Sequence, residues 1–488
     1  MVGYANVRFN TPHRGRRGGH GKEKKIVEWP AAYLQRKLGG PPVYGILPRE
    51  AWPEEWEGKF VNPLVPIEGA VYGLKRAGHD FNAQADEEYH KLGWISCRKY
   101  DADPCVYIRN SARENAPDAI ARWTDDNFVC VEKGDSTRTL DELGTVFPHE
   151  VKARFDLPQK YVGIITNVES VNEHLEKVTY DQVRYTRGIV DDFIVEFKKL
   201  FPGKTLRQKD APLPAGVARD DSHEGGDTPG VFADTCRKYM GAINFVQRCT
   251  RPDIAYSVSL LCGALDKWGK GADDLLIHLF GYLDKHWNLI LVCWVDKRDF
   301  LNGGKSLKLV LKSDASFAPG GANKGTSGWI VFLTGPRTCA IVGWGANRQK
   351  VESLHTAESE LHAIVTGTRA LTRIANLGDA LMGFAREADA MGEVQDGPEL
   401  QQKLQVDASA TERALKLGFS DKFSHSRRTH RISLAWAHEY WKEPREVGLV
   451  SGKDFVPDAL TKSLATELHL KYVGDMCLRP GPGLGGAA

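Results

Sequence analysis

The segment from residue 306 to 464 constrains the fold most. Three apolar runs typical of strands come first, separated by turn-forming residues: SLKLVLKSD from 306, SGWIVFLT from 327 and TCAIVGWG from 338. The pattern then predicts a long helix (356–381), a strand (403–407), two helices (410–418 and 431–441), a strand (445–451) and a short helix (457–464). Three strands followed by alternating helices and strands predict a mixed-sheet α+β or α/β domain over 305–465.

Four carboxylates mark the ends of these predicted elements. Asp314 ends the first strand, Glu360 lies in the first turns of the long helix, Asp407 ends the next strand and Asp458 opens the last helix. Strand ends and helix starts can converge at one sheet edge, where four carboxylates can hold two Mg²⁺ or Mn²⁺ ions about 3.5–4 Å apart. Each aspartate alone could be a turn former or a helix cap. Their order together favours a metal site.

A second acidic feature is the adjacent pair Asp125 and Asp126, inside the apolar run ARWTDDNFVCV at 121–131. The flanks are typical of two strands, so the pair is expected at the turn between them. Neighbouring carboxylates repel each other unless a cation binds them, and oxygen ligands suit Mg²⁺. A solvated hairpin turn is the simpler interpretation of this pair alone.

Composition limits the class of protein. The 488 residues are 42% apolar and 26% charged, which is typical of a globular chain, and a net charge of +2 gives no global basic field. No apolar run is long enough for a membrane span, so no membrane partner is expected. The nine cysteines include no C-x₂-C pair, so the sequence supports neither a zinc knuckle nor a redox dithiol. Scattered single cysteines favour a reducing, intracellular setting, cytoplasmic or nuclear.

Several segments in order resemble one family, the Pol polyproteins of copia-type LTR retrotransposons. VYGLKRAG at 71, DADPCVYI at 101 and TDD at 124 are similar to the reverse transcriptase, and CTRPDIAYSVS at 249 to the segment that leads to ribonuclease H. SDAS at 313, TSGWIVFL at 326, AESELHAI at 357, VDASA at 406 and PDALTKSL at 457 resemble the ribonuclease H itself.

Composition and the resemblance together predict a domain order. A basic disordered arm is expected at 1–25, suited to phosphate contacts or simply a tail. A reverse transcriptase palm and thumb remnant would follow at 26–202, a linker at 203–230, a helical connection at 231–304, the ribonuclease H-like domain at 305–465 and a disordered tail at 466–488. The implied partner is an RNA–DNA hybrid or another nucleic acid; no oligomeric state is implied.

The resemblance also implies site residues. Asp314, Glu360, Asp407 and Asp458 would bind metal for two-metal phosphodiester chemistry. Glu360 is preferred to its neighbour Glu358 because Glu-Leu-x-Ala-Ile is the helix pattern of the family. Asp125 and Asp126 would bind Mg²⁺ (or Mn²⁺) in the palm, with Glu28 as the third catalytic carboxylate. Lys75, Tyr72 and Phe81 would lie near the template path, although the two aromatic residues could equally belong to the core.

The polymerase part departs from the family pattern. Glu28 stands where the family has aspartate, Trp29 adds bulk beside it, and Trp123 replaces the usual tyrosine. Only 27 residues precede Glu28, so the fingers region is expected to be missing. We therefore expect impaired polymerase activity and a more intact ribonuclease H site. The alternatives are a non-enzymatic nucleic-acid-binding remnant, a decayed element, or another metal-dependent nuclease of the same fold; whether the chain is an enzyme stays open.

Overall fold

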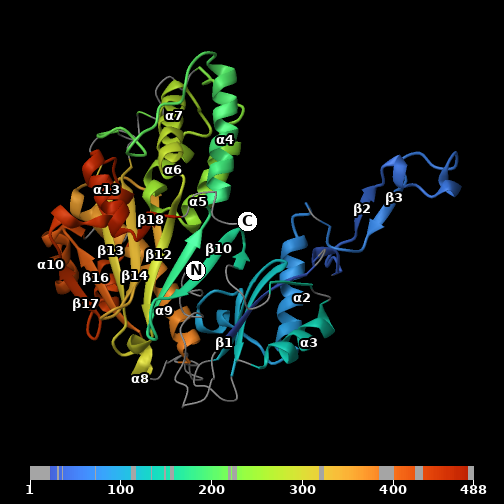
Figure 1. The fold of residues 1–488 in the computed structure, drawn as a ribbon, viewed down its shortest axis with the longest axis horizontal. Helices are drawn as coiled ribbons and strands as arrows, with labels where there is room; N and C mark the ends of the chain where they lie inside the picture. The colour runs from blue at the N-terminus through green and yellow to red at the C-terminus, as the bar shows by residue number, and fades with distance from the viewer. Residues whose placement is uncertain are drawn as a thin grey trace. The chain divides into compact units, whose positions relative to one another are not determined.

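The structure is a computed structural model (Figure 1). It describes residues 22–29, 32–35, 37–71, 73–110, 117–132, 134–147, 150–153, 159–217, 221, 228–317, 324–383, 400–423 and 432–481. The chain forms two compact units, Arg14–Val162 and Gly163–Ala488. Residues 163–202, expected with the palm, therefore cluster with the C-terminal part. Both units are mixed α+β, as predicted.

The first unit is built on an antiparallel sheet with the order β4-β5-β6-β7-β1-β8. The strands are β1 (Lys22–Glu28), β4 (Ile95–Ser96), β5 (Val106–Arg109), β6 (Asp118–Trp123), β7 (Asp126–Glu132) and β8 (Glu150–Ala153). A separate hairpin joins β2 (Val43–Ile46) and β3 (Leu64–Ile67), and β9 spans Gln159–Tyr161. Short 3₁₀ helices are η1 (Ala32–Gln35), η2 (Arg49–Ala51), η3 (Glu54–Trp56) and η4 (Cys97–Tyr100).

Two helices pack on this sheet, α2 (Ala77–Lys91) and α3 (Ser136–Val146). The core includes Val27, Phe81 and Val129, all almost fully buried. Side chains alternate along a strand, so the residues before and after Val27 and Val129 face the other side of the sheet. Phe81, expected either near the template path or in the core, is therefore a core residue. Tyr72, for which the same two interpretations were open, lies outside the described residues.

The sheet of the second unit has the order β17-β16-β13-β14-β15-β12-β11-β10, with β18 also paired to β12. The strands are β10 (Ile164–Ser170), β11 (Leu175–Asp181), β12 (Leu289–Asp296), β13 (Lys308–Ser316), β14 (Thr326–Thr334), β15 (Cys339–Arg348), β16 (Gln401–Val406), β17 (Glu446–Leu449) and β18 (Leu478–Pro480). β13, β16 and β17 are parallel neighbours, whereas β14 and β15 run antiparallel. The sheet is mixed, as the sequence predicts.

Helices cover this sheet (Figure 1). The long α9 (Thr356–Met382) packs against β13 and β14, and α10 (Ser409–Leu417) and α12 (Leu434–Tyr440) follow β16. The other helices are α4 (Val183–Leu200), α5 (Cys236–Cys249), α6 (Ala255–Cys262), α7 (Lys270–Lys285), α8 (Leu301–Gly304) and α13 (Thr466–Asp475). Short 3₁₀ helices are η6 (Pro252–Ile254), η7 (Lys297–Phe300), η8 (Asp421–Phe423), η9 (Gly452–Asp454) and η10 (Val456–Leu460).

A buried ion pair anchors the helical layer. The Arg251 guanidinium donates to both carboxylate oxygens of Asp253, at 2.9 and 2.7 Å, and the Tyr282 hydroxyl donates to the same carboxylate at 2.7 Å. Arg251 is only 1% exposed. Losing one partner of such a pair costs about 3–5 kcal/mol, because the other charge stays buried. The Arg-Pro-Asp motif therefore has a packing role.

The structure corrects three sequence expectations. Residues 466–480 of the supposed disordered tail form α13 and β18, because Leu478 pairs with Leu291 and Met476 is fully buried. Residues 22–25, which were expected in the basic arm, belong instead to the strand Lys22–Glu28. Residues 1–21 of the predicted arm lie outside the described part of the chain. The supposed linker 203–230 contributes Leu206 and Leu213 to the core. No helix among the described residues is long and apolar enough to cross a membrane.

Candidate metal centre

Two carboxylates of the candidate site come from parallel neighbours in the sheet. β13 and β16 pair in a register that sets Lys312 opposite Gln405. Asp314 lies two residues after Lys312, and Asp407 lies two residues after Gln405. The two aspartates are therefore at the same end of the two strands and on the same face of the sheet. Asp314 is only 3% exposed, while Asp407 is half-buried.

The third carboxylate comes from α9. His355 caps this helix, and its ring nitrogen Nδ1 accepts a hydrogen bond from the backbone N–H of Glu358 at 3.2 Å. The carboxylate of Glu358 in turn accepts from the backbone N–H of Leu354 at 2.8 Å, so it stabilises the helix start. Glu360, one turn into the helix, instead points toward the two strand aspartates.

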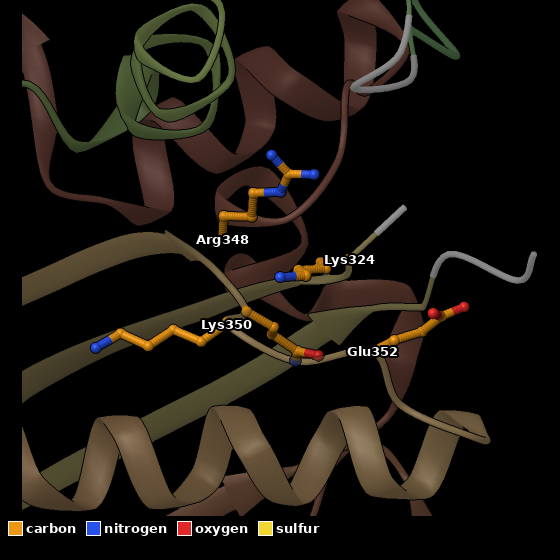
Figure 2. A pocket seen from close by; sticks show the side chains of 5 residues that line it. Lys324, Arg348, Lys350 and Glu352 are labelled. Atoms are coloured by element: carbon orange, nitrogen blue, oxygen red, sulfur yellow. The ribbon is translucent and has the colours of Figure 1, made fainter. Parts of the chain in front are cut away.

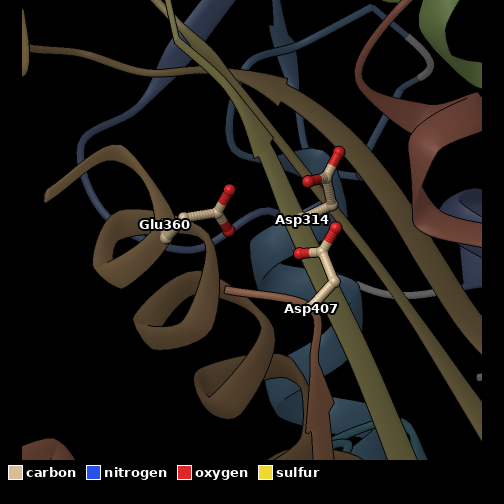
Figure 3. Close-up of side chains that lie close together, drawn as sticks. All are labelled: Asp314, Glu360 and Asp407. Atoms are coloured by element: carbon tan, nitrogen blue, oxygen red, sulfur yellow. The ribbon is translucent and has the colours of Figure 1, made fainter. Parts of the chain in front are cut away.

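The three carboxylates converge, as Figure 3 shows for Asp314, Glu360 and Asp407. One ligand oxygen of each lies within 4.8 Å of the others, and among the described residues no other group of three acidic, histidine or cysteine side chains is this close. The buried Glu360 Oε2 has no hydrogen-bond partner among the described residues. A buried acceptor without a donor is costly, so this oxygen is available to a cation.

The electrostatics of the cluster favour a cation. Burial, together with the charges of Asp314 and Asp407, raises the pKa of Glu360 to about 9. Burial and the charge of Asp314 also raise the pKa of Asp407. Three close carboxylates resist ionising together, and a bound cation reverses this cost. An all-oxygen donor set suits Mg²⁺ or Mn²⁺ rather than a soft metal, so the residues fit the predicted ion.

Asp458 lies beside the cluster but outside the group of three. Burial raises its pKa to about 6, and its carboxyl shares a hydrogen bond with Asp314. The Lys462 ammonium is 2.7 Å from Asp458 Oδ1 and 3.9 Å from Asp314 Oδ2. The Thr461 hydroxyl also donates to Asp314. Lys462 and Thr461 were not predicted as site residues, although both belong to the PDALTKSL motif, where Lys462 is four residues after Asp458.

A glycine allows η10 to approach the sheet. Gly328 of β14 pairs with Asp314 across the strands. A Cβ at this position would lie 2.6 Å from Thr461 Cγ2 and 2.9 Å from Leu460 Cβ. Any larger residue would push η10, and with it Asp458, away from Asp314.

The second predicted site lies in the first unit. Asp126 begins β7 and pairs directly with Glu28 at the end of β1, so the two side chains share one face of the sheet. Asp125 lies in the turn, where its carbonyl accepts from the backbone N–H of Trp29 at 3.0 Å. Burial, then the charge of Asp125, raises the pKa of Asp126. The three carboxylates do not form a cluster as close as that around Asp314.

The turn itself is strained. Thr124 adopts a φ of 55°, a left-handed conformation that is unfavourable for a β-branched residue. Such strain is concentrated at functional sites. Trp123 is 60% exposed beside the turn.

The expectation that Trp29 crowds the palm carboxylates is wrong. It is fully buried on the opposite face from Glu28 and stacks on Phe147, with ring centroids 4.0 Å apart. The alternation of a strand gives the reason, because consecutive side chains point to opposite faces.

A basic groove lies beside the start of α9, the helix that carries Glu360. It has a volume of about 580 Å³ and is lined by Lys324, Arg348, Gln349, Lys350 and Glu352 (Figure 2). Three cations against one carboxylate give it a positive potential. Gln349 Nε2 donates to the backbone carbonyl of Ser359 at 3.0 Å, next to Glu360. The groove was not predicted, because only the fold brings Lys324 to the segment that holds Arg348, Gln349, Lys350 and Glu352.

Comparisons with known proteins found relatives by sequence. No protein-family model matches the chain. It is 23% identical over 332 residues to the retrovirus-related Pol polyprotein from transposon TNT 1-94 of Nicotiana tabacum, which covers 65% of this chain but 22% of that polyprotein. It is 26% identical to an uncharacterized mitochondrial protein of Arabidopsis thaliana, over 33% of this chain and 60% of that protein.

The chain is thus similar to retrotransposon Pol polyproteins, and the predicted resemblance to their copia-type members is confirmed. It spans about a fifth of the length of the first relative.

Two solved structures are more distant. A foamy viral protease-reverse transcriptase in complex with an RNA/DNA hybrid has a TM-score of 0.41 and 8% identity, over 92% of this chain and 45% of that one. Ribonuclease H1 from the halophilic archaeon Halobacterium salinarum has a TM-score of 0.21 and 15% identity, over 32% of this chain and 94% of that one.

The raised pKa of Glu360 predicts how stability depends on pH without metal. The folded state keeps a proton that the unfolded state releases, so stability is greatest below the ordinary glutamate pKa of 4.5 and falls as pH rises toward 9. Each unit of pKa shift corresponds to about 1.4 kcal/mol. In a chelating buffer, Glu360→Gln should therefore raise the free energy of unfolding by a few kcal/mol at pH 8 and change little at pH 4.

Urea denaturation at the two pH values measures this effect. Glu467→Gln, at an exposed position, is the matched control and should change neither value. Equal stability of wild type and Glu360→Gln at pH 8 would contradict the proposed crowding of carboxylates.

Proposed function

We propose that this chain is a divalent-cation-dependent ribonuclease H that cleaves the RNA strand of an RNA–DNA hybrid. The observation that carries the proposal is the convergence of Asp314, Glu360 and Asp407 within 4.8 Å at one sheet edge. The similarity to a retrotransposon Pol polyprotein supports the same reaction class. Because the chain matches only part of that relative, the activity is a proposal for this chain.

The carboxylates would hold Mg²⁺ or Mn²⁺, which when bound activates a water and stabilises the leaving oxygen of the phosphodiester. The role of the protein is to fix the oxygen donors before the substrate arrives. The β13–β16 pairing fixes Asp314 and Asp407, and the capped start of α9 fixes Glu360. Asp458 would complete the acidic set, with Lys462 balancing its charge when no substrate phosphate is near.

We further propose that the palm site retains little or no polymerase activity. Glu28 opposes Asp126 in the strand register, which supports the assignment of the three palm carboxylates. However, glutamate extends the carboxylate by one methylene relative to the family's aspartate. A displacement of about 1 Å can reduce catalysis about 100-fold. The looser arrangement of these carboxylates agrees with a weakened metal site.

A paired assay on one preparation tests both proposals. With Mg²⁺, the protein should cleave RNA in a hybrid but extend a primed template poorly or not at all. Asp314→Asn should lower hybrid cleavage by at least about 100-fold, since one group that stabilises developing charge is worth about 10²–10³ in rate. Asp266→Asn, at a side chain 95% exposed, should leave cleavage unchanged.

Three outcomes would contradict these proposals. Primer extension at a rate typical of reverse transcriptases would refute the polymerase proposal. Absence of hybrid cleavage would instead favour a non-enzymatic nucleic-acid-binding remnant. Equal cleavage of hybrid and DNA duplex would favour a different nuclease of the same fold.

The basic groove supplies a phosphate-binding surface for such a substrate. Lys324 and Lys350 line it, and Gln349 joins it to the residue before Glu360. A hybrid is recognised mainly through its shape and backbone, so cations beside the cleavage site suit it.

The double variant Lys324→Gln, Lys350→Gln should weaken hybrid binding and make its salt dependence shallower. The slope of log K against log salt should fall by about 0.7–0.9 for each phosphate that the protein no longer neutralises. Fluorescence anisotropy over a salt series measures this slope. Lys199→Gln, exposed at the end of α4, is the control. An unchanged slope in the double variant would exclude the groove from the interface.

A further inference from the structure

Cys339 and Cys477 are distant in sequence but lie along the same edge of β12. Trp294 of β12 pairs with Cys339, and the backbone N–H of Val292 donates to the Cys477 carbonyl at 2.8 Å. Positions 292 and 294 are on the same strand face and about 6.6 Å apart. Disulfide-bonded cysteines have Cα separations of about 4.4–6.8 Å, so the register alone brings the pair within bonding range.

The two sulfur atoms also interact directly. Hydrogen bonding with the Cys477 thiol, aided by the positive charges of Lys312 and Arg479 and opposed by partial desolvation, lowers the pKa of Cys339 to about 7. The thiolate is the reactive form of cysteine, and an exposed thiolate in positive surroundings is typical of redox-active sites. Cys339 is exposed and Cys477 is buried, an arrangement that suits an attacking and a resolving thiol.

The surroundings of Cys477 are unusual for an ordinary core cysteine. It adopts a φ of 58° directly after α13, a position where glycine is the usual residue. The remaining charged or titratable groups that act on the pair are Asp475, near Lys312, and the buried thiol of Cys293.

We propose that Cys339 and Cys477 are a redox-sensitive pair that forms a reversible disulfide when the protein meets hydrogen peroxide. The Cys339 thiolate attacks one peroxide oxygen, the O–O bond breaks and hydroxide leaves, which makes a sulfenic acid. The Cys477 sulfur then attacks the Cys339 sulfur, forming the S–S bond and releasing water. In total two thiols lose two electrons and two protons, and one peroxide becomes two waters.

The disulfide joins the C-terminal end of the chain to the sheet. It connects the junction of α13 and β18 to the first residue of β15. α13 packs against η10, the element that carries Asp458, so the bond restrains the support of that residue. Disulfides in reducing compartments are usually transient and redox-sensing, which fits a switch better than a permanent crosslink. The inference does not depend on the proposed nuclease activity.

Peptide mapping tests the pair directly. The purified protein is treated with hydrogen peroxide, remaining thiols are alkylated, and the digest is analysed by mass spectrometry with and without dithiothreitol. We expect one crosslinked peptide pair containing Cys339 and Cys477 that dithiothreitol separates. Amides of residues 466–480 should exchange with deuterium several-fold more slowly in the oxidised protein, and its Tm should rise by several degrees.

Matched variants separate this pair from general oxidation. Cys339→Ser changes an exposed residue and should abolish both the crosslink and the slower exchange. Cys262→Ser, at a half-buried cysteine elsewhere in the same unit, should change neither. If wild-type Cys339 becomes sulfinic acid, or both cysteines stay separately alkylated after peroxide treatment, the proposal is overturned. Because the mapping uses the wild-type chain, it does not require a Cys477 variant to fold.

Discussion

Mutual repulsion of three carboxylates is the constraint on which the candidate centre depends. Asp314, Glu360 and Asp407 are held within 4.8 Å of one another by a strand register and a capped helix. Neither element can move its carboxylate away without losing buried sheet or helix packing. The fold therefore maintains an arrangement whose electrostatic cost a divalent cation would remove. This explains why Glu360 is buried without a hydrogen-bond donor for one of its oxygens.

In the palm site, the fold holds the acidic side chains together less closely than in the candidate metal centre. Glu28 and Asp126 share a sheet face, and the strained turn at Thr124 places Asp125 beside them. Their surroundings are more exposed, and they do not converge as closely as the cluster in the second unit. The two acidic sites thus differ in how far the fold forces their carboxylates together. That difference underlies our proposal of one retained and one impaired activity.

Much of the second unit could be predicted from sequence because its elements are amphipathic and well delimited. The runs at β13, β14 and β15 and the helix α9 were expected within a few residues of their bounds. β12 was missed, since LILVCWV continues an apolar helical region and is identified as a strand only by pairing with β11. The tail was missed because its glycines and prolines obscured Leu478, which pairs with β12.

The candidate site likewise contains some residues that the sequence could predict and others that it could not. Spacing and motif identified Asp314, Glu360 and Asp407, because each follows or begins a recognisable element. Lys462 and the groove cations Lys324 and Lys350 depend on which loops meet in space, and no local pattern carries that information. For Trp29, by contrast, a local pattern was sufficient. Simple strand alternation would have placed this side chain in the core, on the face opposite Glu28.

Isothermal titration of the metal-free protein with Mg²⁺ tests the central claim most directly. We predict saturable binding in the wild type, strong weakening by Asp314→Asn or Asp407→Asn, and unchanged binding in Asp266→Asn. Binding that neither substitution at Asp314 or Asp407 weakens, or no binding at all in the wild type, would contradict the account.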